Sequence, residues 1–231
     1  MEENQYDQDS QNVNPLASLA LLPSVLSKQE ELTFMNILFS SSARVRRDNF
    51  GLPRKEVEKQ LGIEHDDKAF LSFLFRVNQA ISRYFQCIYD EQRDQVVVLM
   101  RVNARQARGV LSKEAMAILM YIFYEQEVMQ HPFTLFEKLL EAFGHETFQA
   151  NRKVHNHLDV LLKIGAIELY DAALTEEAYQ LTAIGKHMFS DSFLRRFTEF
   201  SQSTQLNMDD VLKFYKRYNL EGRLDDDSME T

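Results

Sequence analysis

The side chains that could catalyse a reaction or bind a metal ion are few in this chain. Three histidines lie close together in the sequence, at His145, His155 and His157. His155 and His157 are two positions apart on a predicted helix, so their side chains point about 200° apart and cannot easily share one metal ion. The single cysteine, Cys87, lies in a predicted strand with no activating base beside it. We therefore expect no metal site and a cysteine that belongs to the core.

Other catalytic patterns are missing from the sequence. It contains no Gly-rich phosphate-binding loop and no paired cysteines of a metal site. The acidic pairs at 66–67 and 176–177 lie at predicted helix starts or turns, where capping explains them. We therefore expect a protein that is not an enzyme and needs no cofactor.

Basic side chains form the remaining candidate group, because Lys and Arg can neutralise DNA phosphates. They cluster in a predicted loop and the helix after it, in a predicted linker, and at the start of a helix in the second half. The candidate contacts to the DNA backbone are Arg44, Arg46, Arg47, Arg54, Lys55, Arg105, Arg108, Arg152 and Lys153. Such contacts would position the protein without reading sequence. The same side chains could instead pair with acids of this chain or of a partner.

Composition limits the classes of protein that fit. The chain has 231 residues and a net charge of −9, so binding DNA with its whole surface is a poor fit, although a local basic patch is compatible. Its 7 glycines and 4 prolines favour helices over an all-β fold. It has no apolar run of about 18 residues, the length that would span a membrane. The acidic start is unlike a signal peptide, and one cysteine suits a reducing compartment, so we expect a cytoplasmic protein.

A helical phrase that occurs twice indicates how these residues are positioned. One copy begins at Ser27 and the other at Ser112. The identical pairs are Ser27/Ser112, Lys28/Lys113, Met35/Met120 and Ile37/Ile122. Each copy is followed by two more helical stretches and two strand-like stretches, which is the order of a winged helix. We predict a mainly α (α+β) fold with tandem winged-helix domains, small β-hairpin wings and extra terminal helices.

The predicted organisation has four parts. They are a flexible tail and apolar arm at 1–26, winged-helix domains at 27–103 and 109–190, and C-terminal helices with an acidic tail at 191–231. Pro23 is expected to break or kink a helix in the arm. The arm either packs on the core as a strap or binds a partner chain. Its candidate contact residues are Leu16, Leu19, Leu21 and Leu22.

In the first repeat, Ser27 and Glu30 predict a capping box at the start of a helix. This helix is expected to bury Leu32, Met35 and Phe39. The elements predicted after it are a loop at 41–51, helices at 53–61 and from 66–67 onward, and strands at 85–89 and 95–100.

In the second repeat, the helix from Ser112 is followed by two more helices and two strands. They are predicted at 134–143, about 148–164, 166–170 and 178–182. Thr182 is expected to cap a last helix at 183–189, and further helical pieces are predicted at 193–200 and 208–218.

The side chains of the third helix in each repeat distinguish a DNA-reading protein from a protein-binding one. In winged-helix proteins that read DNA, this helix enters the major groove. In the first repeat it opens with Asp66 and Asp67, and the predicted hairpin tip at 90–94 is also acidic. Both would repel phosphates. In the second repeat it opens with cationic Arg152 and Lys153. The second repeat is thus the more permissive of the two for DNA.

Residues 111–126 resemble the opening of the second winged helix in the ScpB-type "kite" subunits of SMC complexes. The long helices and the C-terminal pair of helices look more like the MukE or Wadjet type. The resemblance implies a non-enzymatic subunit that forms a homodimer and binds a kleisin chain. Its implied partners are the kleisin and an SMC-type ATPase that acts on DNA, in chromosome organisation or plasmid defence. It also implies association with the nucleoid or with DNA.

Two other interpretations remain open from the sequence. One is a winged-helix transcriptional regulator, which requires sequence-specific binding by the third helix of the second repeat. The other is a scaffold or adaptor unrelated to SMC proteins.

Overall fold

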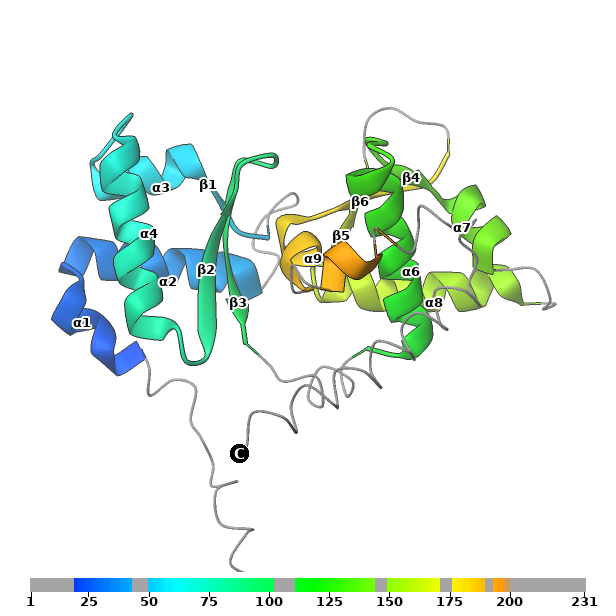
Figure 1. Ribbon diagram of the computed structural model, residues 1–231, viewed down its shortest axis with the longest axis horizontal. Helices are drawn as coiled ribbons and strands as arrows, with labels where there is room; N and C mark the ends of the chain where they lie inside the picture. Colours follow the sequence, from blue (N-terminus) through cyan, green and yellow to red (C-terminus); the bar gives the residue numbers. More distant parts are fainter. Residues whose placement is uncertain are drawn as a thin grey trace, which may run out of the picture.

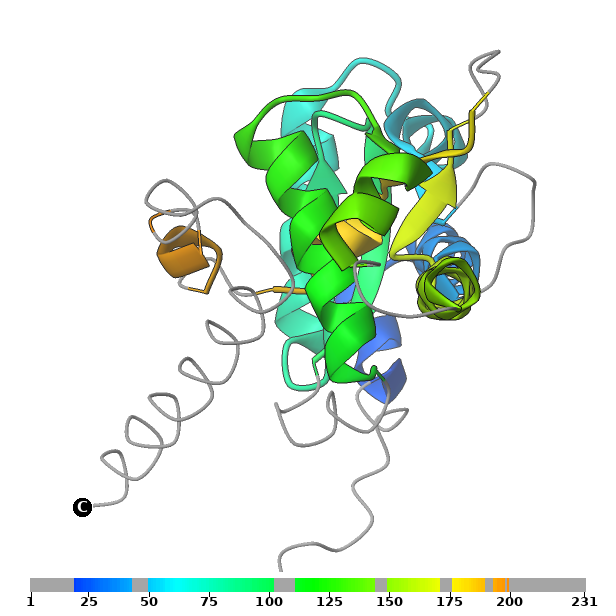
Figure 2. The same ribbon diagram turned by 90° about the vertical axis from the view of Figure 1, so that its right-hand side faces the viewer.

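The computed structural model describes residues 19–42, 50–101, 111–143, 149–170, 176–189, 193–197 and 199. These residues form two units that lie side by side along the long axis, with unit one at 19–101 and unit two from 111 onward (Figure 1). Viewed along that axis, one unit lies behind the other (Figure 2). The fold is α+β and mostly helical, with two small three-stranded antiparallel sheets. No helix in the described ranges is both long and apolar enough to cross a membrane.

Unit one consists of helices around a sheet whose strand order is β1-β3-β2. Its helices are α1 (Leu22–Val25), α2 (Lys28–Ser42), α3 (Arg54–Leu61) and α4 (Asp67–Ile81). Its strands are β1 (Leu52–Pro53), β2 (Phe85–Asp90) and β3 (Gln95–Met100). The predicted strands of the hairpin are confirmed, and β2 extends one residue beyond its predicted end.

Local caps set the helix boundaries in unit one, as predicted. The backbone N–H of Ser27 donates to Glu30 at 2.8 Å, and that of Glu30 donates to the Ser27 hydroxyl at 3.3 Å, which completes the capping box. Asp66 accepts from the backbone of Ala69 at the start of α4. Gly62 ends α3 in the left-handed region, with φ of 68°.

The buried face of α2 differs from the prediction. Leu32 and Phe39 are each 61% exposed, and Met35 is only partly buried. Phe34 and Ile37 are fully buried instead, in the core that α2 shares with α4 and the sheet. Apolar residues occupy both sides of α2, so the spacing fits either face. Packing against the rest of unit one decides which face is buried.

The apolar arm behaves as a strap in its described part. Leu22 is buried in the core of unit one, and Leu19 packs against that core. Leu21 stays exposed. Pro23 does not prevent a helix, because it lies in the first turn of α1, where its missing N–H is tolerated. Leu16 lies outside the described residues.

Unit two repeats this order. Its helices are α6 (Lys113–Phe123), α7 (Phe136–Phe143), α8 (Ala150–Lys163) and α9 (Ala183–His187), with a π-helix, η2, at Tyr124–Val128. Its strands β4 (Thr134–Leu135), β5 (Ile167–Leu169) and β6 (Ala178–Leu181) have the order β4-β6-β5. Thr182 caps α9 as predicted, and its hydroxyl accepts from the backbone N–H of Gly185 at 3.1 Å.

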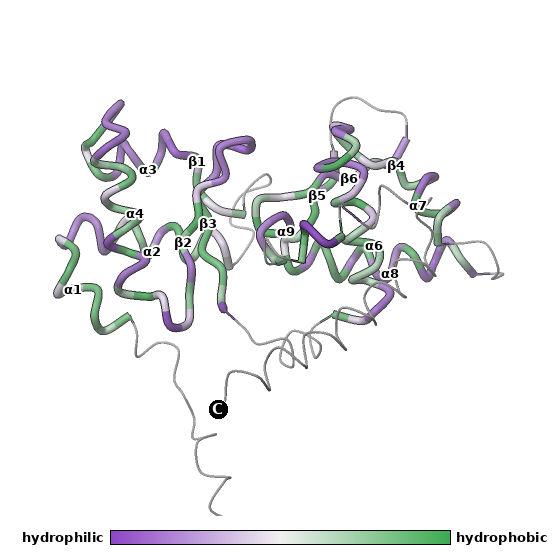
Figure 3. Tube along the Cα trace, in the orientation of Figure 1, coloured by the Kyte–Doolittle hydropathy of each residue, from purple (hydrophilic) through white to green (hydrophobic). Residues whose placement is uncertain are grey.

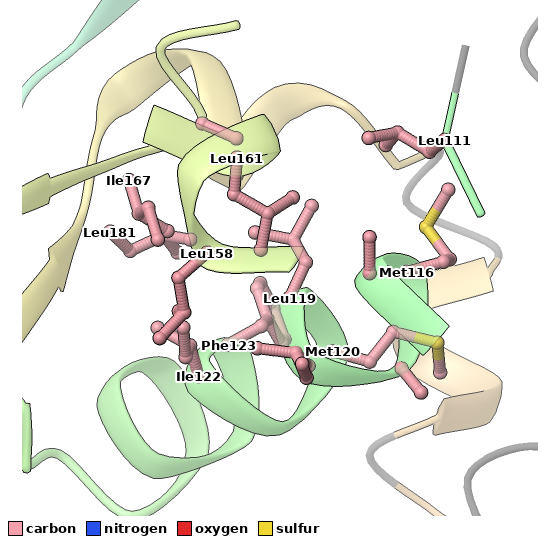
Figure 4. Close-up of a cluster of buried hydrophobic side chains, with 14 of the residues drawn as sticks. Leu111, Met116, Leu119, Met120, Ile122, Phe123, Leu158, Leu161, Ile167 and Leu181 are labelled. Atoms are coloured by element: carbon pink, nitrogen blue, oxygen red, sulfur yellow. The ribbon is translucent and has the colours of Figure 1, made fainter. Parts of the chain in front are cut away.

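The first helix of unit two is buried on nearly all sides, unlike α2. Figure 4 shows Leu119, Met120, Ile122 and Phe123 of α6 in the core with side chains of α8 and the sheet. Residues 193–197 are helical, as predicted, and Phe193 and Phe197 belong to the same core. The helix predicted at 208–218 lies outside the described residues.

Two short strands and the π-helix were not predicted. Pro53 and Thr134 were assigned to helix starts, yet each lies in a two-residue strand that precedes a helix. These strands pair with the return strand of each hairpin, Leu52 with Val96 and Thr134 with Tyr179. Two residues carry no periodic signal, so only the pairing reveals them.

Candidate functional site

Arg54, a candidate DNA contact, is bound within unit one. Its Nε lies 2.5 Å from Glu58 Oε1, its Nη2 donates to Asp67, and its guanidinium stacks 4.7 Å from the ring centroid of Phe70. Hydrogen bonds to Asp67 and Glu58 raise the pKa of Arg54, against a smaller opposite effect of burial. This arginine therefore stabilises the α3–α4 corner. Neighbouring Lys55 is exposed.

The cationic opening of α8 remains at the surface. Arg152 and Lys153 are exposed, and so are Asn151 and Asn156. These side chains give unit two a polar helix face that could contact phosphate or an acidic partner. The other basic candidates, Arg44, Arg46, Arg47, Arg105 and Arg108, lie outside the described residues.

His155 on the same helix is partly buried and contacts other elements of unit two. Its ring lies 4.1 Å from the ring of Phe136, Nδ1 lies 2.9 Å from the carbonyl oxygen of Asn151, and Nε2 lies 3.1 Å from Glu177 Oε2. Both nitrogens face acceptors, which only the doubly protonated ring can satisfy together. Burial acts to lower the pKa of His155, but the hydrogen bonds to Asn151 and Glu177 outweigh it and raise the pKa. His155 therefore links α8 to Glu177, the residue before β6.

Unit one exposes pairs of large apolar side chains on two helices. Leu32 and Phe39 lie two turns apart on α2, and Leu71 and Phe75 lie one turn apart on α4. Each of the four is at least 60% exposed. Hydrophobic stretches of both helices appear green in Figure 3. Exposed apolar side chains of this size are typical of protein-binding surfaces.

Cys87 is a core residue of β2, as predicted. It is buried, and burial raises the pKa of its thiol to about 12, so the reactive thiolate is not populated at neutral pH. Within the described ranges, no three His, Cys, Asp or Glu side chains are grouped to hold a metal ion. His157 contacts the Ser112 hydroxyl at 3.3 Å, and His145 lies outside the described ranges.

The sequence interpretation missed Arg93. It was read as one charge in an acidic hairpin tip. Arg93 instead reaches across to unit two, where its Nη2 lies 2.6 Å from Glu127 Oε1. No local pattern reveals a partner so distant in the sequence, and only the docking of the two units brings them together.

Comparison with known proteins identifies no family for this chain, because no protein-family model and no curated protein matches it. A functional proposal must therefore be argued from these surfaces.

Proposed function

We propose that this protein is a non-enzymatic, kite-like subunit built from tandem winged-helix domains. It forms a homodimer and binds a kleisin chain within an SMC-type ATPase complex that acts on DNA. Chromosome organisation or plasmid defence is the setting that the resemblance of residues 111–126 implies.

The observation that supports this proposal most is the duplicated topology. In each unit a long helix leads to a two-residue strand, two more helices and a hairpin, and the short strand pairs with the return strand of the hairpin. The strand orders β1-β3-β2 and β4-β6-β5 correspond position by position. This arrangement is compatible with two winged helices in tandem.

The surface of unit one favours protein binding over DNA reading. In a winged-helix reader the third helix presents donors and positive charge to the groove. On α4 the exposed side chains include Leu71 and Phe75, and its N-terminus carries Asp66 and Asp67. An apolar helix surface with an acidic end suits a protein partner and would repel DNA.

Affinity capture of the tagged full-length chain from its source cells at gentle salt tests this function. The proposal predicts recovery of a kleisin and a large coiled-coil ATPase in fixed ratio. Failure to recover both would contradict it. Recovery of an unrelated assembly in their place would favour the scaffold interpretation.

Surface variants sharpen that experiment. Phe75→Glu and Leu32→Glu add a charge to the exposed apolar faces, so partner recovery should fall several-fold while the folded state is kept. Met129→Glu is the matched control, because Met129 is an exposed apolar residue of unit two. Equal recovery for all three variants would exclude the α2 and α4 faces as the partner surface.

A winged-helix transcriptional regulator is the second candidate. The exposed Arg152 and Lys153 at the start of α8 favour it. It requires that α8 bind one DNA sequence selectively, which Arg152→Ala with Lys153→Ala should abolish.

A further inference from the structure

The hairpin of unit one lies against unit two. Strand β3 packs on α9, and the 91–94 turn reaches the end of β6 (Figure 1). In a free wing this turn would point into solvent and be available to DNA. Here unit one contacts unit two through a group of apolar side chains and a group of charged side chains.

The apolar part is a small core shared by the units. Phe50 and Val97 of unit one are buried together with Ala183 and Ile184 of unit two. Gly165 lies directly against the ring of Phe50, and a Cβ at that position would come within 2.4 Å of the ring. The absence of a side chain at Gly165 therefore lets the Phe50 ring pack there.

The charged part centres on Arg93, which makes three contacts with its guanidinium. Nε donates to the carbonyl oxygen of Leu181 at 2.8 Å, and Nη2 pairs with Glu127 at 2.6 Å, both in unit two. Nη1 pairs with Asp90 of its own hairpin at 3.1 Å. Only 17% of the Arg93 side chain is exposed. A planar guanidinium with its donors used in this way holds its neighbours in a defined geometry.

Contacts from α9 complete the charged part. Lys186 Nζ donates to Gln92 Oε1 at 3.1 Å and pairs with Glu127 Oε2 at the same distance. His187 Nε2 lies 3.4 Å from Asp90 Oδ2, and the Asp90 side chain is almost fully buried. The charges that face Asp90 and Glu127 thus come from both units.

We infer that the β2–β3 hairpin of unit one is a clasp that joins the two units into one rigid body, with Arg93 as its positioning residue. Units within one chain move freely unless their interface is substantial and well packed. Opening this interface would separate Arg93 from Glu127 and from the Leu181 carbonyl, and Asp90 from His187. It would also expose the apolar cluster that the two units share to water, which is unfavourable. The clasp also withdraws the unit-one hairpin from nucleic acid.

Crosslinking tests the closed clasp in a folded protein. Gln92→Cys and Lys186→Cys together place two thiols where the native side chains touch, while buried Cys87 does not react. A short bis-maleimide should crosslink the pair within one chain almost completely. A Gln92→Cys, Lys153→Cys pair is the control and should not crosslink within the chain. Absent crosslinking in the first pair would overturn the inference.

Spin labels test the role of Arg93. Lys59→Cys and Lys153→Cys place labels at exposed positions on α3 and α8, one in each unit. Pulsed electron resonance should give one narrow distance distribution in this parent. Arg93→Ala should broaden it, and Arg83→Ala, which removes an exposed arginine from the same unit, should leave it unchanged. An Arg93→Ala distribution as narrow as the parent's would contradict the role of Arg93. If that variant does not fold, the crosslinking result decides.

Discussion

His155 has an acceptor at each ring nitrogen, and Asp90 is a carboxylate surrounded by cations from two units. At this residue scale the sequence predicts local contacts well. Ser27 and Asp66 cap helices through neighbours three positions away, so their roles were predictable. The partners of His155 and Arg93 lie on other elements, and only the fold identifies them.

Replacing His155 should change how stability depends on pH. The pKa of His155 is raised in the folded state, so its contribution is fully present below the unfolded pKa near 6.5 and is lost as pH rises through the folded value. His155→Gln should therefore lower the melting temperature most at low pH, with the gap to wild type closing as pH rises. Thermal unfolding followed by circular dichroism measures this gap. A gap that widens with pH would contradict the role, and Lys153→Gln serves as the control.

Asp90 should show the opposite pH dependence. Burial acts to raise its pKa, but the hydrogen bond from His187 and the charges of Arg93 and Lys186 outweigh it, so the pKa falls well below its usual range. The stabilisation is present above the unfolded pKa of about 3.8 and is lost as pH falls toward the folded value. Asp90→Asn should thus unfold at lower urea than wild type at neutral pH. The difference should hold constant down to about pH 5 and shrink below about pH 4. An unchanged difference at pH 3 would contradict this account.

At the scale of elements, periodicity and caps predicted the long helices and the hairpins. The prediction of the buried face of α2 was wrong. Helical spacing fits the predicted set, Leu32, Met35 and Phe39, and it fits the buried pair, Phe34 and Ile37, equally well. The π-helix was also missed. It widens the last turn after α6, so that Glu125, Gln126 and Glu127 bind three different parts of the structure, namely α7, β6 and the hairpin of unit one.

Gln126 is the buried connection between this π-helix and the sheet of unit two. Its side-chain amide donates to the Tyr179 carbonyl and the Thr134 hydroxyl, each at 3.0 Å, and its oxygen accepts from the Leu181 backbone at 2.7 Å. Gln126→Ala leaves at least two buried groups without partners, each worth about 1–3 kcal/mol, so we expect a loss of about 2–4 kcal/mol. Urea unfolding measures this loss. Gln79→Ala, at an exposed position of unit one, should change stability little, and an equally small effect at Gln126 would contradict the connection.

For the whole molecule, the repeat predicted two similar units but not how they dock. Docking depends on Phe50, Gly165 and Arg93, none of which belongs to the repeated phrase. It uses the hairpin of unit one for an internal contact and leaves apolar side chains of α2 and α4 at the surface. The cationic start of α8 remains the described surface best suited to DNA. This distribution of surfaces supports the proposal of a protein-binding subunit that contacts DNA without reading its sequence.

Selection of bound DNA from a random-sequence pool distinguishes DNA contact without sequence reading from sequence-specific recognition. We expect the full-length chain to bind weakly, to enrich no sequence, and to release DNA between about 50 and 150 mM salt, as phosphate-only contacts do. Enrichment of one sequence with nanomolar affinity at about 150 mM salt would contradict it and establish the DNA-reading alternative.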